Sequence, residues 1–133
     1  ERGGDQWIED GYAEYEKRLK PQQVELVTVW HRTDQQLLAA VEGSKAPVIC
    51  LDPTGAQWSS ERFSDMLFSK LEDGGSRLMF VIGGAEGLPP ELKRSGNLMS
   101  LSKLTFTHQM ARMLLAEQVY RAAEIRRGSG YHK

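Results

Sequence analysis

The sequence lacks a pair of cysteines for a disulfide and any segment suited to a membrane helix or a signal peptide. It contains one cysteine, Cys50, so an intrachain disulfide is excluded. Because Cys50 lies in the apolar run 48–51, we expect a buried, inert thiol in a reducing compartment. No apolar run approaches the ~20 residues of a membrane helix, and no signal peptide is visible after Glu1. We therefore expect neither a membrane span nor a secretion signal, and a processed or trimmed start.

The sequence also has almost no excess charge. Its 17 basic and 18 acidic residues leave a formal net charge of −1. Proteins that coat nucleic acid use many lysines and arginines to neutralise phosphates, so this balance disfavours that class. It allows a local basic patch at the C-terminal end, which holds Arg112, Arg121, Arg126, Arg127 and Lys133. His31, His108 and His132 are scattered and no His or Cys pair has ligand spacing, so we predict no metal site.

Length and apolar periodicity predict a single domain over residues 1–133. We expect helices at 5–19, 34–43, 59–74, 89–93 and 108–126, and strands at 24–30, 47–51, 78–82 and 98–101. Asp5 and Asp34 are the expected caps of the first two helices. This alternation predicts an α/β fold, with a mostly parallel sheet and helices on both faces. Ligands bind beyond the carboxyl ends of such strands, so the loops after Leu51, Ile82 and Leu101 should share one edge.

The loop 83–87 is rich in glycine, and a glycine turn after a strand lets a ligand approach bare backbone. It is not a Rossmann fingerprint, because Pro89 and Pro90 delay the next helix, and no Walker A lysine motif exists. A tight turn that needs positive φ explains the glycines equally well.

Two further segments carry polar chemistry. In 101–108, the hydroxyl groups can bind backbone or ligand, although simple capping of the long helix by Thr107 accounts for part of the pattern. His108 would then begin that helix, where a neutral imidazole is favoured. The ending Tyr131, His132 and Lys133 combines side chains suited to base stacking, proton transfer and phosphate contact, whereas a frayed terminus is the plain alternative.

Several motifs in order resemble one known group. The segments 49–55, 80–88, 101–112 and 115–122, together with the ending 131–133, are similar to RlmH-type proteins. These are methyltransferases of the SPOUT superfamily that modify ring nitrogen N3 of a pseudouridine in large-subunit ribosomal RNA. The similarity covers nearly the whole chain and is dense from Val48 onward.

The resemblance implies a C-terminal trefoil knot, a homodimer, and S-adenosylmethionine bound by the knot loops. It implies that Gly84 and Gly87 shape one of these loops. The implied cofactor contacts are Leu51, Gly83, Leu101, Ser102, Lys103, Leu104, Thr105 and Phe106.

On the substrate side, the resemblance implies a group of residues completed by the tail of the partner subunit. His132 or His108 would accept the N3 proton, and we favour His132, with Tyr131 as a further catalytic candidate. The implied substrate contacts are Arg112, Arg121, Tyr131, His132 and Lys133. Because the net charge is so small, we expect activity on assembled ribosomes. The alternative is a non-catalytic dimeric α/β module that binds a nucleotide or nucleoside as a regulator.

Two differences from the group stand out. Its members open with a short apolar strand that this sequence lacks, and the segment 30–34 is shorter than usual. Trimming, or the loss of mobile residues, accounts for both and would leave the sheet incomplete. The resemblance fits a bacterial cytoplasm or, in a eukaryote, a chloroplast or mitochondrion.

Overall fold

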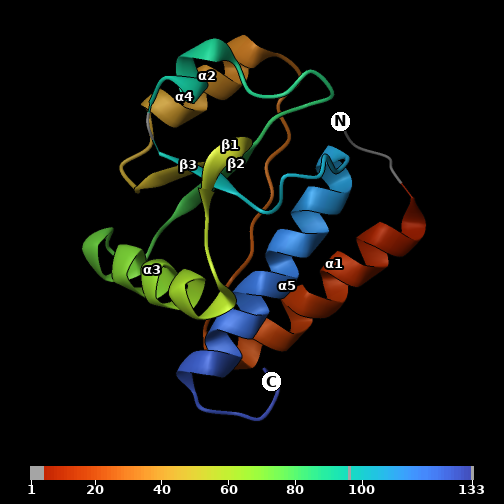
Figure 1. Cartoon of the computed structure of the whole chain (residues 1–133), viewed down its shortest axis with the longest axis vertical. Helices are drawn as coiled ribbons and strands as arrows, with labels where there is room; N and C mark the ends of the chain where they lie inside the picture. The colour runs from red at the N-terminus through yellow and green to blue at the C-terminus, as the bar shows by residue number, and fades with distance from the viewer. Residues whose placement is uncertain (1–4, 96, 133) are drawn as a thin grey trace.

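A computed structural model describes residues 5–95 and 97–132 and confirms an α/β architecture (Figure 1). Nine elements follow one another along these residues. They are α1 (Gln6–Leu19), the 3-10 turn η1 (Lys20–Gln22), α2 (Asp34–Glu42), β1 (Val48–Gln57), α3 (Ser60–Asp73), β2 (Met79–Ile82), α4 (Pro90–Lys93), β3 (Leu98–Ser100) and α5 (His108–Arg126). No helix among the described residues is long and apolar enough to span a membrane.

The sheet is parallel and has the strand order β2-β1-β3, so β1 is its central strand. Leu51 of β1 lies in register with Ile82 of β2 and with Met99 of β3. The register with β3 shifts between Leu51 and Ala56, which leaves residues 52–55 as an excursion before β1 resumes. The predicted parallel sheet is therefore confirmed, and β1 continues past the turn at which we expected it to end.

Successive residues of β1 point to opposite faces of the sheet, and each face has its own core. Ile49 packs with residues of α3 and α5, including Phe63 and Val119. Cys50 packs with Val81 and Leu92, with α2 and α4 covering this face. Figure 1 shows α1, α3 and α5 on one side of the sheet and α2 with α4 on the other. Both faces are thus buried, which explains the unbroken apolar runs of β1 and β2.

The predicted strand at 24–30 is wrong, because no described strand pairs with this segment. Its residues still alternate in burial, with Val24 and Leu26 packed against the core. Val27 and Val29 remain 72% and 68% exposed. β-branched residues favour an extended backbone, but a strand also requires a neighbouring strand to bind its N–H and C=O groups.

The helix ends differ from expectation at two caps. The hydroxyl of Thr33, not the side chain of Asp34, accepts the hydrogen bond from the N–H of Gln36 at the start of α2. Asp5 occupies the N-cap position of α1 without forming a side-chain cap bond. A threonine directly before an acidic first turn competes for the same role, so sequence alone did not distinguish the two.

The C-terminus reverses direction at Gly128, which has φ +74°. Its N–H donates to the carbonyl of Ile125, and the N–H of Ser129 donates to that of Glu124, which is a Schellman motif. Glu124 is itself buried, with only 3% of the residue exposed. It accepts hydrogen bonds from Gln22 (2.8 Å), Arg127 (3.0 and 3.1 Å) and Ser129 (2.7 Å). This one carboxylate joins the end of α5 to η1 and to the returning chain.

The bonds from Arg127, and then from Ser129, hold the pKa of Glu124 below its usual value. Its stabilisation is therefore complete above the unfolded pKa of about 4.3 and is lost as the pH falls through the lower folded pKa. Replacing Glu124→Gln should lower the free energy of unfolding by about 1–2 kcal/mol at pH 7, because charge-assisted hydrogen bonds become neutral ones. Urea unfolding at pH 7 and pH 3 measures the difference.

The difference in free energy of unfolding between wild type and Glu124→Gln should be smaller at pH 3 than at pH 7. The control Glu42→Gln, at an exposed position of α2, should change the free energy of unfolding little at either pH. An equal deficit of Glu124→Gln at both pH values would contradict this account.

Candidate active site

The expected meeting of three loops at one edge is met in part: Leu51 lies beside the end of β2 and beside Met99 of β3, but β1 itself ends at Gln57, opposite Ser100. Because Leu51, Ile82 and Met99 are in register, the segments that follow them begin side by side. Leu51 is half-buried in the core, and Gly83 directly follows β2. This edge therefore brings together the chain segments that hold Leu51, Gly83 and Leu101.

The glycine loop is built around a close approach of backbone to backbone. A Cβ atom on Gly83 would lie 2.4 Å from the carbonyl carbon of Gly87, so only glycine fits there. Gly87 has φ +84° and donates its N–H to the carbonyl of Gly84 at 3.0 Å. Gly84 has open space where a Cβ would be. The turn explanation thus accounts for Gly83 and Gly87 but not for Gly84, which presents exposed backbone.

The second loop, between β3 and α5, is held by its own hydroxyl groups. Ser100 donates to the carbonyl of Ser102 at 2.8 Å, and the Ser102 hydroxyl accepts from the N–H of Leu104 at 3.0 Å. Thr107 caps α5 by accepting from the N–H of Met110. Lys103, Leu104, Thr105 and Phe106 are all exposed. The loop therefore presents backbone and two apolar side chains outward.

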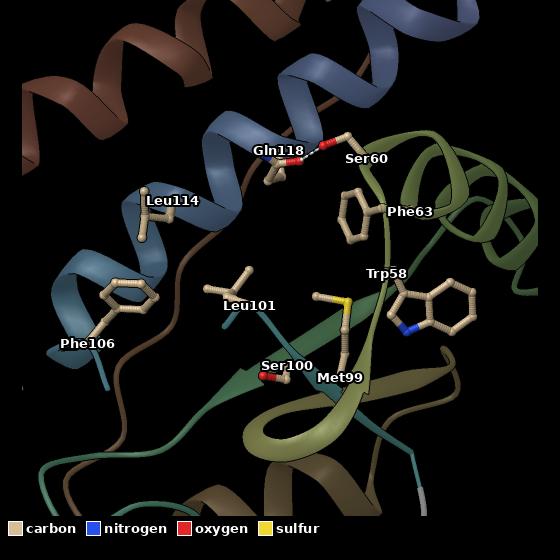
Figure 2. A pocket seen from close by; sticks show the side chains of 9 residues that line it. All are labelled: Trp58, Ser60, Phe63, Met99, Ser100, Leu101, Phe106, Leu114 and Gln118. Carbon is tan, nitrogen blue, oxygen red and sulfur yellow. Dashed lines mark hydrogen bonds between the residues drawn. The ribbon is translucent and has the colours of Figure 1, made fainter. Parts of the chain in front are cut away.

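A pocket of about 230 Å³ opens where this loop meets α3 and α5. Figure 2 shows side chains from the end of β1, α3, β3 and α5 around one common space. Aromatic and aliphatic side chains line it together with the polar groups of Ser60, Ser100 and Gln118. The lining residues are Trp58, Ser60, Phe63, Met99, Ser100, Leu101, Phe106, Leu114 and Gln118.

Only Leu101 and Phe106 among the predicted cofactor residues line this pocket. Sequence reasoning missed Trp58, Phe63 and Gln118. Trp58 carried a usable signal, because an aromatic residue at the carboxyl end of a central strand sits where ligands bind. Phe63 and Gln118 carried none, since a helix face that lines a pocket has the same periodicity as one that lines a core.

The tail, residues 128–132, runs back along α5 after the turn at Gly128. The ring of Tyr131 meets that of Tyr120 edge-on, with centroids 4.8 Å apart. Its hydroxyl donates to Glu117 at 2.9 Å, and Glu117 also pairs with Arg121 at 2.9 Å. Glu117 and Arg121 thus form an ion pair one turn apart on α5.

His132 lies between two charged side chains. Arg121 Nη1 is 3.0 Å from His132 Nδ1, and Glu61 Oε2 is 2.9 Å from His132 Nε2. Glu61 belongs to the first turn of α3, so the tail connects α5 with α3. The remaining predicted tail residue, Lys133, lies outside the described residues.

Hydrogen bonds also join the tail to the wall of the pocket. Ser60 donates to the side-chain oxygen of Gln118 at 2.8 Å, across the pocket (Figure 2). Gln118 in turn donates to Glu117 at 2.9 Å, and the other oxygen of Glu117 holds Tyr131 and Arg121. Glu117 therefore connects the tail to Gln118 in the wall of the pocket.

His108 and Arg112 belong to a different cluster. The Arg112 guanidinium lies 3.5 Å from the centroid of the Tyr12 ring, and it bonds Glu9 at 3.1 Å. His108 meets Trp30 edge-on at 6.5 Å. Nine residues of helix separate Arg112 from Arg121, which is about 14 Å. Within one chain, the structure brings Arg121, Tyr131 and His132 together and leaves His108 and Arg112 apart from them.

Within the described residues, no three His, Cys, Asp or Glu side chains form a group that could hold a metal ion. The titratable groups beside the pocket are instead paired with one another. Burial, and then the hydrogen bond to Glu117, raises the pKa of Tyr131 to about 12. Tyr131 is therefore protonated at neutral pH and acts as a hydrogen-bond donor.

A spectrophotometric titration tests this assignment. The difference between wild type and Tyr131→Phe in phenolate absorbance should have its midpoint near pH 12. Because the folded state keeps this proton more tightly than the unfolded chain, the stability that Tyr131 contributes should fall as the pH rises from about 10 to about 12. A midpoint near 10 would show that the phenol is not buried against Glu117.

Comparisons with known proteins agree with this arrangement. A family model described as "Predicted SPOUT methyltransferase" matches residues 2–132. "Ribosomal RNA large subunit methyltransferase H" of Protochlamydia amoebophila is 50% identical over 129 residues, which covers 97% of this chain and 91% of that protein. Proteins of the same name from Symbiobacterium thermophilum and Streptococcus thermophilus are 39% and 38% identical, over 97% of this chain and 92% of each protein. The resemblance is thereby confirmed, and the chain belongs to the SPOUT methyltransferase family.

Proposed function

We propose that this protein uses S-adenosylmethionine to methylate N3 of a pseudouridine in large-subunit ribosomal RNA, in assembled ribosomes. One observation carries the proposal: hydrogen bonds through Gln118 and Glu117 connect a pocket beside the sheet to a tail that holds an imidazole and a phenol. The relatives' shared name, which specifies ribosomal RNA of the large subunit, supports the substrate.

The residues around the pocket fit the proposed methyl donor. Phe63, Phe106 and Trp58 provide aromatic surface for an adenine ring and for a sulfonium cation. The exposed backbone at Gly84 and along 101–106 offers N–H and C=O groups for the polar edges of a nucleoside. S-adenosylmethionine supplies an electrophilic methyl group when it is bound. We infer that the two loops belong to a C-terminal trefoil knot, which family membership supports.

The tail supplies the remaining chemistry. We propose His132 as the acceptor of the N3 proton and Tyr131, protonated at neutral pH, as a donor to the base or its ribose. Arg121 and Lys133 would contact phosphate. Arg112, by contrast, is already held by Tyr12 and Glu9, and we assign it to fastening α1 against α5.

We further infer a homodimer in which each tail can also serve the neighbouring copy. The unpaired segment 24–30, with Val27 and Val29 exposed, supports a covered surface on this side of the molecule. The net charge of −1 is poorly suited to wrapping free RNA, which supports recognition of a folded ribosomal site.

Two glycine variants test the cofactor site. Gly83→Ala should lose both thermal stability and affinity for S-adenosylmethionine, because its Cβ would clash with the backbone at Gly87. Gly84→Ala should keep its stability, since nothing lies near its Cβ, yet lose about tenfold or more in affinity if the ligand approaches that backbone. Calorimetry and thermal unfolding on both proteins measure this, and unchanged affinity in both would contradict the site.

Methyl transfer to ribosomes tests the function itself. Wild type with S-adenosylmethionine should add one methyl group to large-subunit RNA, detected by mass spectrometry, and His132→Ala should reduce the rate by about 10²-fold or more, as expected for loss of a general base. Deletion of 131–133 should abolish transfer while keeping cofactor affinity, whereas a nucleotide-binding regulator would lose little. Normal turnover by His132→Ala would exclude it from the chemistry.

A further inference from the structure

The contacts of His132 define which of its nitrogens carries the proton. A guanidinium has only donors, so Nδ1 must be the acceptor of the bond from Arg121 at 3.0 Å. The remaining nitrogen, Nε2, then carries the hydrogen and donates it to the carboxylate of Glu61 at 2.9 Å. Two neighbours that differ in charge therefore select one neutral tautomer.

The start of α3 fixes the place of Glu61, whose carboxylate also forms hydrogen bonds with its own backbone and with the side chain of Ser59. It stands in the first turn of α3, directly after the pocket residue Ser60, and its side chain is 63% exposed whereas that of His132 is 22% exposed. The hydrogen bond from His132 is the main reason that the pKa of Glu61 lies below its usual value. The carboxylate is thus ionised and in place when the tail lies against α3.

We propose that Glu61 is a positioning residue for the proton acceptor: it holds Nε2–H of His132 and so keeps the lone pair of Nδ1 as the basic site. This inference rests on the proposed function. A carboxylate that binds one imidazole nitrogen and thereby orients the other is a recurring arrangement in general-base catalysis.

Arg121 then marks the place that the substrate takes. Its N–H points at the lone pair of Nδ1, where the N3–H of a uracil-type ring would also have to donate. When that ring replaces Arg121, the proton passes from N3 to Nδ1 and leaves its electron pair on N3. The imidazolium that forms is stabilised by the negative charge of Glu61. Arg121 remains held by Glu117 at 2.9 Å, beside the incoming nucleotide.

Long-range proton–nitrogen NMR spectra of the full chain test the tautomer without any cofactor. The signals of His132 are identified by their loss in His132→Ala. Wild type and Arg121→Ala should both show His132 as a single Nε2–H tautomer, because Glu61 alone can hold Nε2–H, whereas the double variant Arg121→Ala with Glu61→Ala should show a mixture of both tautomers. Glu72→Ala, at an exposed position near the other end of α3, is the matched control and should match wild type. The same single tautomer in the double variant as in Arg121→Ala would overturn the inference.

Ribosome methylation tests the consequence. Glu61→Ala should lower kcat by about fivefold, as expected for loss of an exposed ion pair, with KM changed less than about twofold. Glu61→Asp should restore part of kcat because it returns the carboxylate, and Glu72→Ala should leave kcat unchanged. Equal kcat in Glu61→Ala and wild type would overturn the role of Glu61 alone. If wild type transfers no methyl group, the proposed function itself fails and the role of Glu61 in the reaction fails with it, whatever the NMR result.

Discussion

Parallel pairing of β1 with a strand on each side is the constraint on which the other features depend. A central parallel strand must be apolar on both faces, which gives this small chain two separate cores. It also places the end of β2 beside Leu51 and the end of β3 beside the end of β1, so the glycine loop starts next to β1 and the hydroxyl-rich loop starts next to the segment that leads into α3. The pocket follows from the topology before any side chain is considered.

The long helix α5 connects this edge to the rest of the molecule. Most of the arginines on it and at its end form ion pairs with carboxylates of the same chain. Arg112 pairs with Glu9, Arg121 with Glu117, and Arg127 with Glu124. Each arginine is thereby held in a fixed geometry and contributes little to a long-range field. Under the proposed function, this pairing favours recognition of RNA through shape and a few local contacts, in line with the near-zero net charge.

Much of this arrangement was predictable from the sequence, and the exceptions have physical reasons. The apolar runs of β1 and β2 and the apolar spacing along α3 identify those elements, because burial on defined faces leaves a periodic signal. The segment 24–30 carries the same local signal as a strand but forms none, since pairing depends on a neighbour that local sequence does not reveal. The convergence of loops was likewise predictable from topology. The contact between Glu61 and His132, 71 residues apart, was not, because the Schellman turn directs the tail and only tertiary structure determines where it arrives.

Because the chain reverses at that turn, the length of α5 determines where the tail lies. From Glu117 to Arg121 and on to Glu124, each contact with the returning chain depends on the angular phase of the helix, which advances about 100° per residue. One residue inserted between Arg121 and Gly128 would rotate the turn at Gly128 by about 100° around the axis of α5. Tyr131 and His132 would then lie against a different face of the helix. The number of residues between Arg121 and Gly128 must therefore stay constant for the tail to reach its partners.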